Sequence, residues 1–420
     1  MTDSVAQGRS EARAAAHSGG ERLHALDAAR AGALLLGVFF HAALSFLPDP
    51  QIWIVRDDQS AALGGLFYVS HIFRMTLFFV LAGFFARMAL HKRGVAGFIG
   101  DRAKRIVLPL AIFWPLVFAA IIACFVWGFV ATVGPEAAAA APPPPPMTAK
   151  TFPLTHLWFL YVLIIFYAGA LALRGAVVAV DRKGRLRGVV DGFVSPIIEQ
   201  PFGFMALAAP AAAALYLKPD WLLWFGVPTP DIGVLPNMTA MIAYGGAFGF
   251  GWLLQRQPRL LEILRKRWAL NLAFAVALTA GLIAYIGVAP IVTPSAQDWK
   301  KAAYGAAYAS AIWTWTFGLI GASMQFLSSP NPAIRYTADA SYWIYIVHLP
   351  LIMAFQVIAF GVDAPWTVKY PAIVFAAFAA AFVSYHLFVR YSFIGRMLGG
   401  KKRLAAARGG KQNVAAAAAE

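Results

Sequence analysis

The side chains that could take part in chemistry in this sequence lie inside unusually apolar segments. The stretch HALDAARAGALLLGVFFHAALSF (residues 24–46) contains Asp27, Arg30 and His41. His41 follows Arg30 by eleven positions, so in a helix the two side chains share one face, roughly 16 Å apart along the axis. Asp27 lies one turn before Arg30 and is predicted to pair with it. A neutral histidine in this setting is suited to act as a general base.

A second apolar segment, FYVSHIFRMTLFFVLAGFFA (residues 67–86), contains His71 and Arg74 on one helix face. If the two segments cross in opposite directions, His71 lies at about the depth of His41. An arginine at that depth requires a partner or an aqueous cavity. The sequence therefore predicts a polar cavity between helices. The alternative is a network of interhelical hydrogen bonds that only fixes packing.

Three further side chains complete the set of candidate site residues. SYWIYIVHLP (residues 341–350) places His348 near the middle of a later apolar segment, where interhelical packing is again the alternative. Arg102 and Arg105 in GDRAKRIVLP share a helix face and could hold phosphate groups, although taken alone the pair is better explained as ordinary positive-inside charge. GxSxG, P-loop, GxGxxG and HExxH motifs are absent, and the single cysteine excludes a cysteine-rich metal site. The sequence therefore indicates histidine-based chemistry without a metal.

The elements that position these residues are predicted to be membrane helices. The chain of 420 residues is 60% hydrophobic and only 13% charged, which is more apolar surface than a soluble core can bury. About ten segments have the length and apolarity of a membrane span. We therefore predict an all-α polytopic integral membrane protein. The segments lie near residues 26–46, 65–88, 106–132, 156–179, 202–217, 234–255, 268–288, 302–326, 338–360 and 369–392.

Basic residues gather on one side of these predicted spans. The three long loops at residues 91–105, 173–187 and 256–267 each contain five Lys or Arg and fall on the same side as both terminal segments. Cytoplasmic loops carry the excess of Lys and Arg, so the pattern predicts an even number of spans with both termini in the cytoplasm. This topology also accounts for the net charge of +16 without a nucleic-acid partner.

The two ends of the chain differ from the apolar middle. Residues 1–23 are polar and contain no apolar h-region, so we expect a disordered cytoplasmic tail and no cleavable signal peptide. Residues 396–420 are basic and alanine-rich and are predicted to form a second cytoplasmic tail. Residues 24–395 between them are predicted to form one transmembrane domain.

Five stretches, in this order, resemble the membrane-bound acyltransferase 3 family. They are LDAARAGALLLGVFFH, FRMTLFFVLAGFF, DRAKRIVLP, HLWFLYVLIIFY and SYWIYIVHLP. Within the family, the sequences most similar to these stretches belong to the branch that succinylates periplasmic glucans. The stretches that carry this similarity are HIFRMTLFFVLAGFF, HLWFL and DASYWIYIVHLP. The chain departs from the family pattern in LDAAR, where LDxLRG is typical, but it keeps Arg30 and His41.

This resemblance implies a membrane O-acyltransferase in the bacterial inner membrane. The donor would be cytoplasmic acyl-CoA carrying a succinyl or acetyl group, and no bound cofactor is expected. The acceptor would be a hydroxyl group of a periplasmic glucan or another extracytoplasmic glycan.

The resemblance also suggests roles for the candidate residues. His41 would act as general base on a sugar hydroxyl, while Arg74 or His71 would stabilise the oxyanion. Arg102 and Arg105 would hold the phosphates of acyl-CoA. The remaining candidate site residues are Asp27, Arg30 and His348.

Buried histidine and arginine also suit a proton-coupled transporter of an anionic solute, which is the main alternative. Transporters of that kind commonly contain inverted repeats, and the sequence shows no clear internal repeat. A non-catalytic membrane scaffold would leave the histidines and arginine at one depth unexplained.

Overall fold

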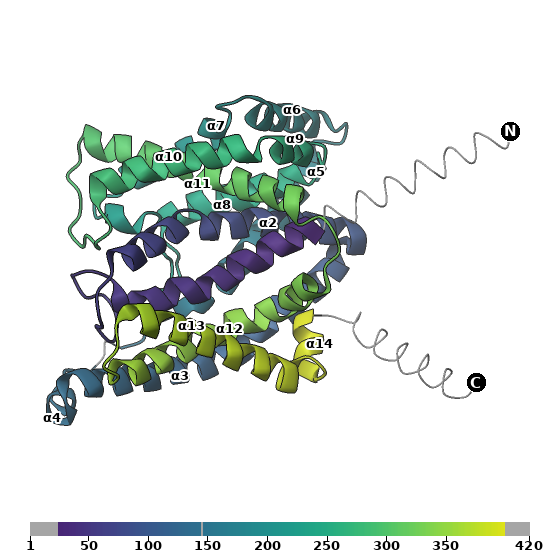
Figure 1. The fold of residues 1–420 in the computed structure, drawn as a ribbon. Helices are drawn as coiled ribbons and strands as arrows, with labels where there is room; N and C mark the ends of the chain where they lie inside the picture. Colours follow the sequence, from purple (N-terminus) through teal and green to yellow (C-terminus); the bar gives the residue numbers. More distant parts are fainter. Residues whose placement is uncertain (1–23, 144–145, 400–420) are drawn as a thin grey trace, which may run out of the picture.

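The computed structural model describes residues 24–143 and 146–399, and these residues form an all-helical bundle (Figure 1). No strand occurs in this part of the chain; a single isolated bridge joins Pro153 to Ile232. The predicted tail 1–23 and most of the predicted tail 396–420 lie outside the described residues. The all-α prediction is confirmed for the part of the chain that can be described.

The helices follow one another with short connections, and a few of them end in tighter or wider turns. The first helix ends in a 3₁₀ turn at Ala43–Phe46, and a π-helical turn at Ala103–Val107 joins α2 to α3. The helices are His24–Phe46, α2 Ala61–Arg102, α3 Leu108–Val133, α4 Pro135–Ala139, α5 Trp158–Val180, α6 Arg185–Glu199, α7 Phe204–Tyr216, α8 Met238–Leu254, α9 Leu260–Lys266, α10 Trp268–Ile286, α11 Trp299–Phe326, α12 Pro332–Phe360, α13 Trp366–Ser384 and α14 Phe393–Gly399.

Within the described residues, six helical stretches are long and apolar enough to cross a membrane, which identifies a multi-pass membrane protein. The pair α6 and α7, bent by 97°, makes a seventh if it is taken as one broken span. Every predicted span coincides with a helix, but α7 and α8 have only 13 and 17 residues. The count of ten spans and the cytoplasmic placement of both termini therefore stay predictions.

The predicted loop at residues 91–105 is wrong. α2 continues as helix as far as Arg102, with one interruption at Gly94, whose φ of 67° is left-handed. Apolar residues within the basic segment explain the extension, because Phe98 is 1% exposed and packs into the core. The basic residues of this segment are therefore held on helix rather than on a mobile loop.

The first helix and α2 run through the middle of the bundle (Figure 1). On one side α2 packs against α8 and α11; on the other side α3, α12 and α13 form a second group. α2 and α8 approach backbone to backbone at Gly83 and Gly251, where an added Cβ would overlap the carbonyl of Phe248 or of Val80. Small residues at such crossings are typical of membrane helices.

The two ends of the bundle differ in character. The arginine end carries Arg30, the Ala103–Val107 turn and α14, which contact one another or lie close together. The opposite, loop end carries the connections at residues 47–60 and 217–237 (Figure 1). The start of the first helix and α14 lie at the same end of the bundle (Figure 1).

Candidate functional site

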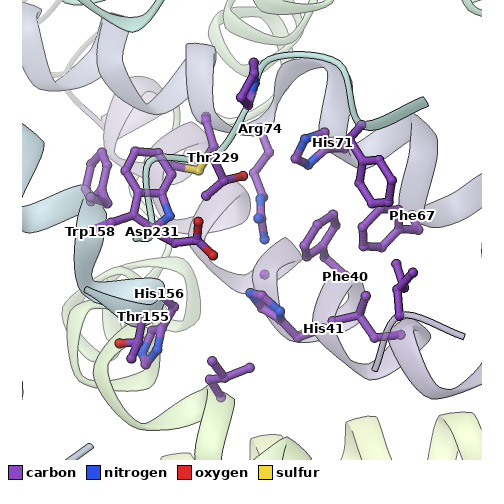
Figure 2. Close-up of a pocket in the computed structure, with 18 of the residues that line it drawn as sticks. Phe40, His41, Phe67, His71, Arg74, Thr155, His156, Trp158, Thr229 and Asp231 are labelled. Carbon is purple, nitrogen blue, oxygen red and sulfur yellow. The ribbon is translucent and has the colours of Figure 1, made fainter. Parts of the chain in front are cut away.

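A cavity of about 1060 Å³ opens at the loop end and reaches into the middle of the bundle. Its walls come from the first helix, α2, α12 and the loops before α5 and α8. Volumes of this order are typical of ligand sites, and this cavity is lined mainly by apolar and aromatic residues with a few polar groups. Its lining includes four histidines and an arginine: His41, His71, Arg74, His156 and His348. Figure 2 shows His41, His71, Arg74 and His156 together with Asp231.

Three of these histidines form a row across the cavity. The ring centroids of His41 and His348 are 5.2 Å apart, and those of His348 and His156 are 5.0 Å apart. The Nδ1 of His348 bonds the Tyr345 carbonyl at 2.7 Å, and the Nε2 of His156 bonds the Ile346 carbonyl at 3.1 Å. A carbonyl only accepts, so these nitrogens carry the hydrogens and the other ring nitrogen is left as an acceptor when the ring is neutral.

His41 is less constrained than its two neighbours. It is half-buried, and its Nδ1 has no hydrogen-bond partner within the described residues. No carboxylate in the described chain pairs with its ring. The geometry therefore leaves the His41 ring available to a group that enters the cavity.

Arg74 is the only cation in the centre of this group of lining residues. Its guanidinium lies 4.0 Å from the centroid of the Phe40 ring, and Phe40 in turn stacks on Phe67. Within the described residues it forms no ion pair, and its buried Nε has no hydrogen-bond partner. A cation–π contact contributes about 2 kcal/mol, whereas the effective penalty of burying an ion is several kcal/mol. Arg74 therefore depends on hydration in the cavity or on a ligand with negative charge.

Gly37 creates the opening beside Arg74. A Cβ at this position would lie 3.1 Å from Nη1 of Arg74 and 3.5 Å from Nε2 of His348. Because Gly37 has no side chain, a space remains on the first helix one turn from His41. The Arg74 guanidinium, a donor, and the His348 Nε2, an acceptor, both face this space.

The backbone at His41 is held by Gln356, a residue of α12 that is 1% exposed. Its Nε2 donates to the carbonyls of His41 (3.0 Å) and Ala42 (3.2 Å), and its Oε1 accepts from the Trp53 indole (2.8 Å). These carbonyls lie where the first helix changes into the 3₁₀ turn of Ala43–Phe46. An amide is suited to this position because it offers both donors and an acceptor.

Two loops form the rim of the cavity. The loop before α5 contributes Thr155 and His156, and the loop before α8 contributes Thr229 and Asp231 (Figure 2). Burial raises the pKa of Asp231 above its ordinary value. The Gly233 N–H donates to the Phe152 carbonyl at 2.8 Å, which ties the two loops together. The rim therefore holds its polar groups at fixed places.

The arginine end carries a separate group of charges. Arg30 pairs with Asp27 at 3.0 Å, as predicted from their spacing. Asp101, 9% exposed, binds Arg102 (2.9 Å) and Arg105 (3.0 Å) and also contacts Arg93. One carboxylate is therefore shared among three guanidinium groups, which leaves a surplus of positive charge.

The structure brings together four of the predicted site residues and places the other four apart. His41, His71, Arg74 and His348 line the cavity. On the first helix the lining ends at Ala33, so the cavity does not reach the arginine end. The predicted residues that lie at the arginine end are Asp27, Arg30, Arg102 and Arg105.

Sequence reasoning missed four residues at the cavity and one at the arginine end: His156, Thr229, Asp231 and Gln356, and Asp101. His156 precedes Trp158 at a helix start, where an interfacial aromatic belt is expected in any membrane protein, so its position gives no separate signal. Gln356 and Asp101 gave no signal beyond being polar residues among apolar or basic neighbours. A polar, uncharged side chain in mid-span was the available hint for Gln356.

Comparison with known proteins identifies the family. A family model described as an acyltransferase domain matches residues 23–386, which is most of the chain. The chain belongs to the acyltransferase 3 family. Membership identifies a membrane acyltransferase and argues against the anion transporter. No solved structure matches the chain.

Among curated proteins, this acyltransferase 3 member is similar to glucans biosynthesis protein C from Escherichia coli. The K12 and SMS-3-5 sequences are each 32% identical to it over 97 residues. The match covers 23% of this chain and spans only 25% of the relative's length.

Proposed function

We propose that this protein transfers a short acyl group, with succinyl favoured, from acyl-CoA to a hydroxyl group of a periplasmic glucan. The observation that supports this most directly is the convergence of His41, His348 and Arg74 in one cavity of an acyltransferase-family chain. The glucan acceptor is suggested by the partial similarity to glucans biosynthesis protein C.

The proposed reaction is a direct transfer. The sugar oxygen attacks the thioester carbonyl carbon while His41 accepts the hydroxyl proton. The tetrahedral oxyanion forms beside Arg74, whose unpaired guanidinium needs no rearrangement to stabilise it. The carbon–sulfur bond then breaks, and the proton passes from His41 to the departing thiolate. His348, with its free nitrogen facing the same space, orients the acyl group from the other side of Gly37.

The donor would enter from the arginine end. Arg30, Arg102 and Arg105 supply the positive charge that the phosphates of acyl-CoA require. An extended pantetheine arm would then run along the first helix from Arg30 to His41, roughly 16 Å away. Since the cavity ends at Ala33, this route requires side chains between Ala33 and Arg30 to move apart.

The test is a transfer assay with the purified protein. It uses succinyl-CoA and acetyl-CoA, each labelled in the acyl group, and a neutral glucan. We expect label on the glucan, with a higher kcat/KM for succinyl-CoA. Label that crosses a liposome membrane without becoming attached to glucan would contradict the proposal.

The donor route has its own test. Replacing both Arg102 and Arg105 by alanine should raise KM for acyl-CoA by about tenfold or more and change KM for the glucan little, because paired charges on phosphate are lost. Lys104→Ala is the matched control, since Lys104 is exposed in the same segment and forms no ion pair there. Equal effects on donor and acceptor would argue against a phosphate site.

A further inference from the structure

The cavity has a polar side that the transfer chemistry above leaves unused. Thr229 and Asp231 lie on the loop before α8 and face the cavity between Arg74 and His156 (Figure 2). Neither residue belongs to a transmembrane helix, and neither contributes to the proposed handling of the proton or of the oxyanion.

Asp231 is a half-buried carboxylate with unused hydrogen-bonding capacity. Within the described residues it forms no ion pair and accepts only from its own backbone N–H. The Thr229 hydroxyl likewise forms no hydrogen bond in this part of the chain. Neither side chain is among the fully buried polar groups that lack a partner, so both can be reached from the cavity, and a ligand that enters it can supply hydrogen bonds to them.

A second aspartate on the same loop shows the contrast. Asp220 also lines the cavity, but it is 72% exposed and pairs with Lys218 at 2.7 Å. Its charge is therefore neutralised and hydrated at the mouth. Asp231 differs because it is more buried than Asp220 and forms no ion pair within the described residues.

The position of Asp231 is fixed by the surrounding backbone. Two residues beyond it the Gly233 N–H donates to Phe152, and the Val234 N–H donates to Ala149, both at 2.8 Å. The Tyr161 hydroxyl donates to the Val234 carbonyl at 2.6 Å. The carboxylate is therefore presented by a braced loop and not by a freely moving one.

We propose that Asp231 and Thr229 form the acceptor subsite and bind a neutral polyhydroxyl substrate, such as a sugar ring, through neighbouring hydroxyl groups. The inference rests on the proposed function, because it names where the acceptor binds in that reaction. An ionised carboxylate only accepts hydrogen bonds and has two oxygens, which suits two adjacent hydroxyl donors.

The same geometry sets the charge of the acceptor. A second anion placed beside Asp231 would be repelled, and in a partly desolvated cavity that repulsion is stronger than in water. Arg74, on the helix side, provides the place for negative charge that develops on the acyl carbonyl. In this arrangement Arg74 faces the carbonyl of the donor and Asp231 faces the neutral acceptor. The cavity therefore selects against acidic sugars.

The experiment compares Asp231→Asn with wild type in the purified full chain, using labelled succinyl-CoA and a neutral β-glucan oligosaccharide. We expect KM for the oligosaccharide to rise roughly 10- to 100-fold, as for loss of hydrogen bonds to a charged group, with KM for succinyl-CoA unchanged. Asp220→Asn is the matched control and should leave both values within about twofold. An oligosaccharide KM for Asp231→Asn within twofold of wild type overturns the proposal, as does an equal rise for succinyl-CoA.

Three further measurements keep the proposal separable from its premise. Thr229→Val should raise KM for the oligosaccharide a few-fold, which provides a test if Asp231→Asn does not fold. Direct titration of the oligosaccharide onto the protein should show weaker binding to Asp231→Asn even if no acyl transfer occurs, in which case the proposed function fails but the subsite stands. Wild type should bind a uronic-acid oligosaccharide more weakly than the neutral one, and this difference in affinity should be smaller for Asp231→Asn. An unchanged difference in affinity contradicts the inference.

Discussion

Gln356 offers a sharp test of how the site is built, because it holds His41 without lining the cavity. Replacing it by leucine keeps the approximate volume and removes three hydrogen bonds: those to the His41 and Ala42 carbonyls and that from Trp53. The indole N–H and the two carbonyls then lose a buried partner. With a net contribution of about 1 kcal/mol for each bond, we expect a loss of about 2–4 kcal/mol in the free energy of unfolding.

The effect on activity should be separable from the effect on stability. Freed of Gln356, the His41 backbone can shift with the 3₁₀ turn that follows it, and misplacement by about 1 Å can lower a rate roughly 100-fold. We therefore expect kcat to fall about 10- to 100-fold for Gln356→Leu at temperatures where it is fully folded, with KM for both substrates little changed.

The assay measures kcat, both KM values and the melting temperature of each variant. Gln325→Leu is the matched control, because the exposed Gln325 accepts a hydrogen bond from Arg265 far from the cavity. Gln356→Glu with an ionised carboxylate should lose as much kcat as Gln356→Leu, since a carboxylate cannot donate hydrogen bonds to the two carbonyls. A Gln356→Leu protein with wild-type kcat but a lower melting temperature would show that Gln356 only stabilises the fold, and would refute the positioning argument.

Two other predictions follow from glycine and from a buried ion pair. Gly37→Ala should raise helix stability by up to about 1 kcal/mol yet lower kcat, because the added Cβ would crowd Arg74. Gly32→Ala is the control: a Cβ there meets open space, so this variant should gain stability and keep its kcat. Equal kcat values for the two variants would contradict the prediction. Asp57 and Lys369, 6% and 8% exposed, pair at 2.8 Å, so either Asp57→Asn or Lys369→Met should lower the free energy of unfolding by about 3–5 kcal/mol. The double variant should be much less destabilised in the same denaturation assay, and additive losses would show that the two side chains are not coupled.

The helices and the centre of the site could be anticipated from local sequence. Apolar length predicts the spans, and the i,i+3 and i,i+11 spacings predict shared faces for His71 with Arg74 and for Arg30 with His41. The helices form as predicted, and His71 and Arg74 line one cavity, because a lipid-facing helix leaves few alternatives for its backbone. The shared face of Arg30 and His41 stays a prediction. The pairing of Asp27 with Arg30 follows from the same local geometry.

The contacts between distant segments could not be anticipated in this way. Gln356 meets His41 across α12 and the first helix, and Asp231 reaches the cavity from a loop whose path depends on a bridge to Pro153. The helical continuation of α2 through its basic segment depends on burial of Phe98, which no local charge pattern reveals. Each of these features is set by tertiary packing, which a single sequence does not encode in short-range spacing.

The central claim is that His41 accepts the proton of the attacking hydroxyl in this cavity. The most direct measurement is the transfer of labelled acyl groups from succinyl-CoA to glucan by purified His41→Ala, beside His386→Ala as a control. His386 is a histidine outside the cavity, near Tyr336. The account predicts that His41→Ala loses transfer by at least about 100-fold while it keeps a wild-type melting temperature, and that His386→Ala transfers normally. Unchanged transfer by a folded His41→Ala protein would contradict the account.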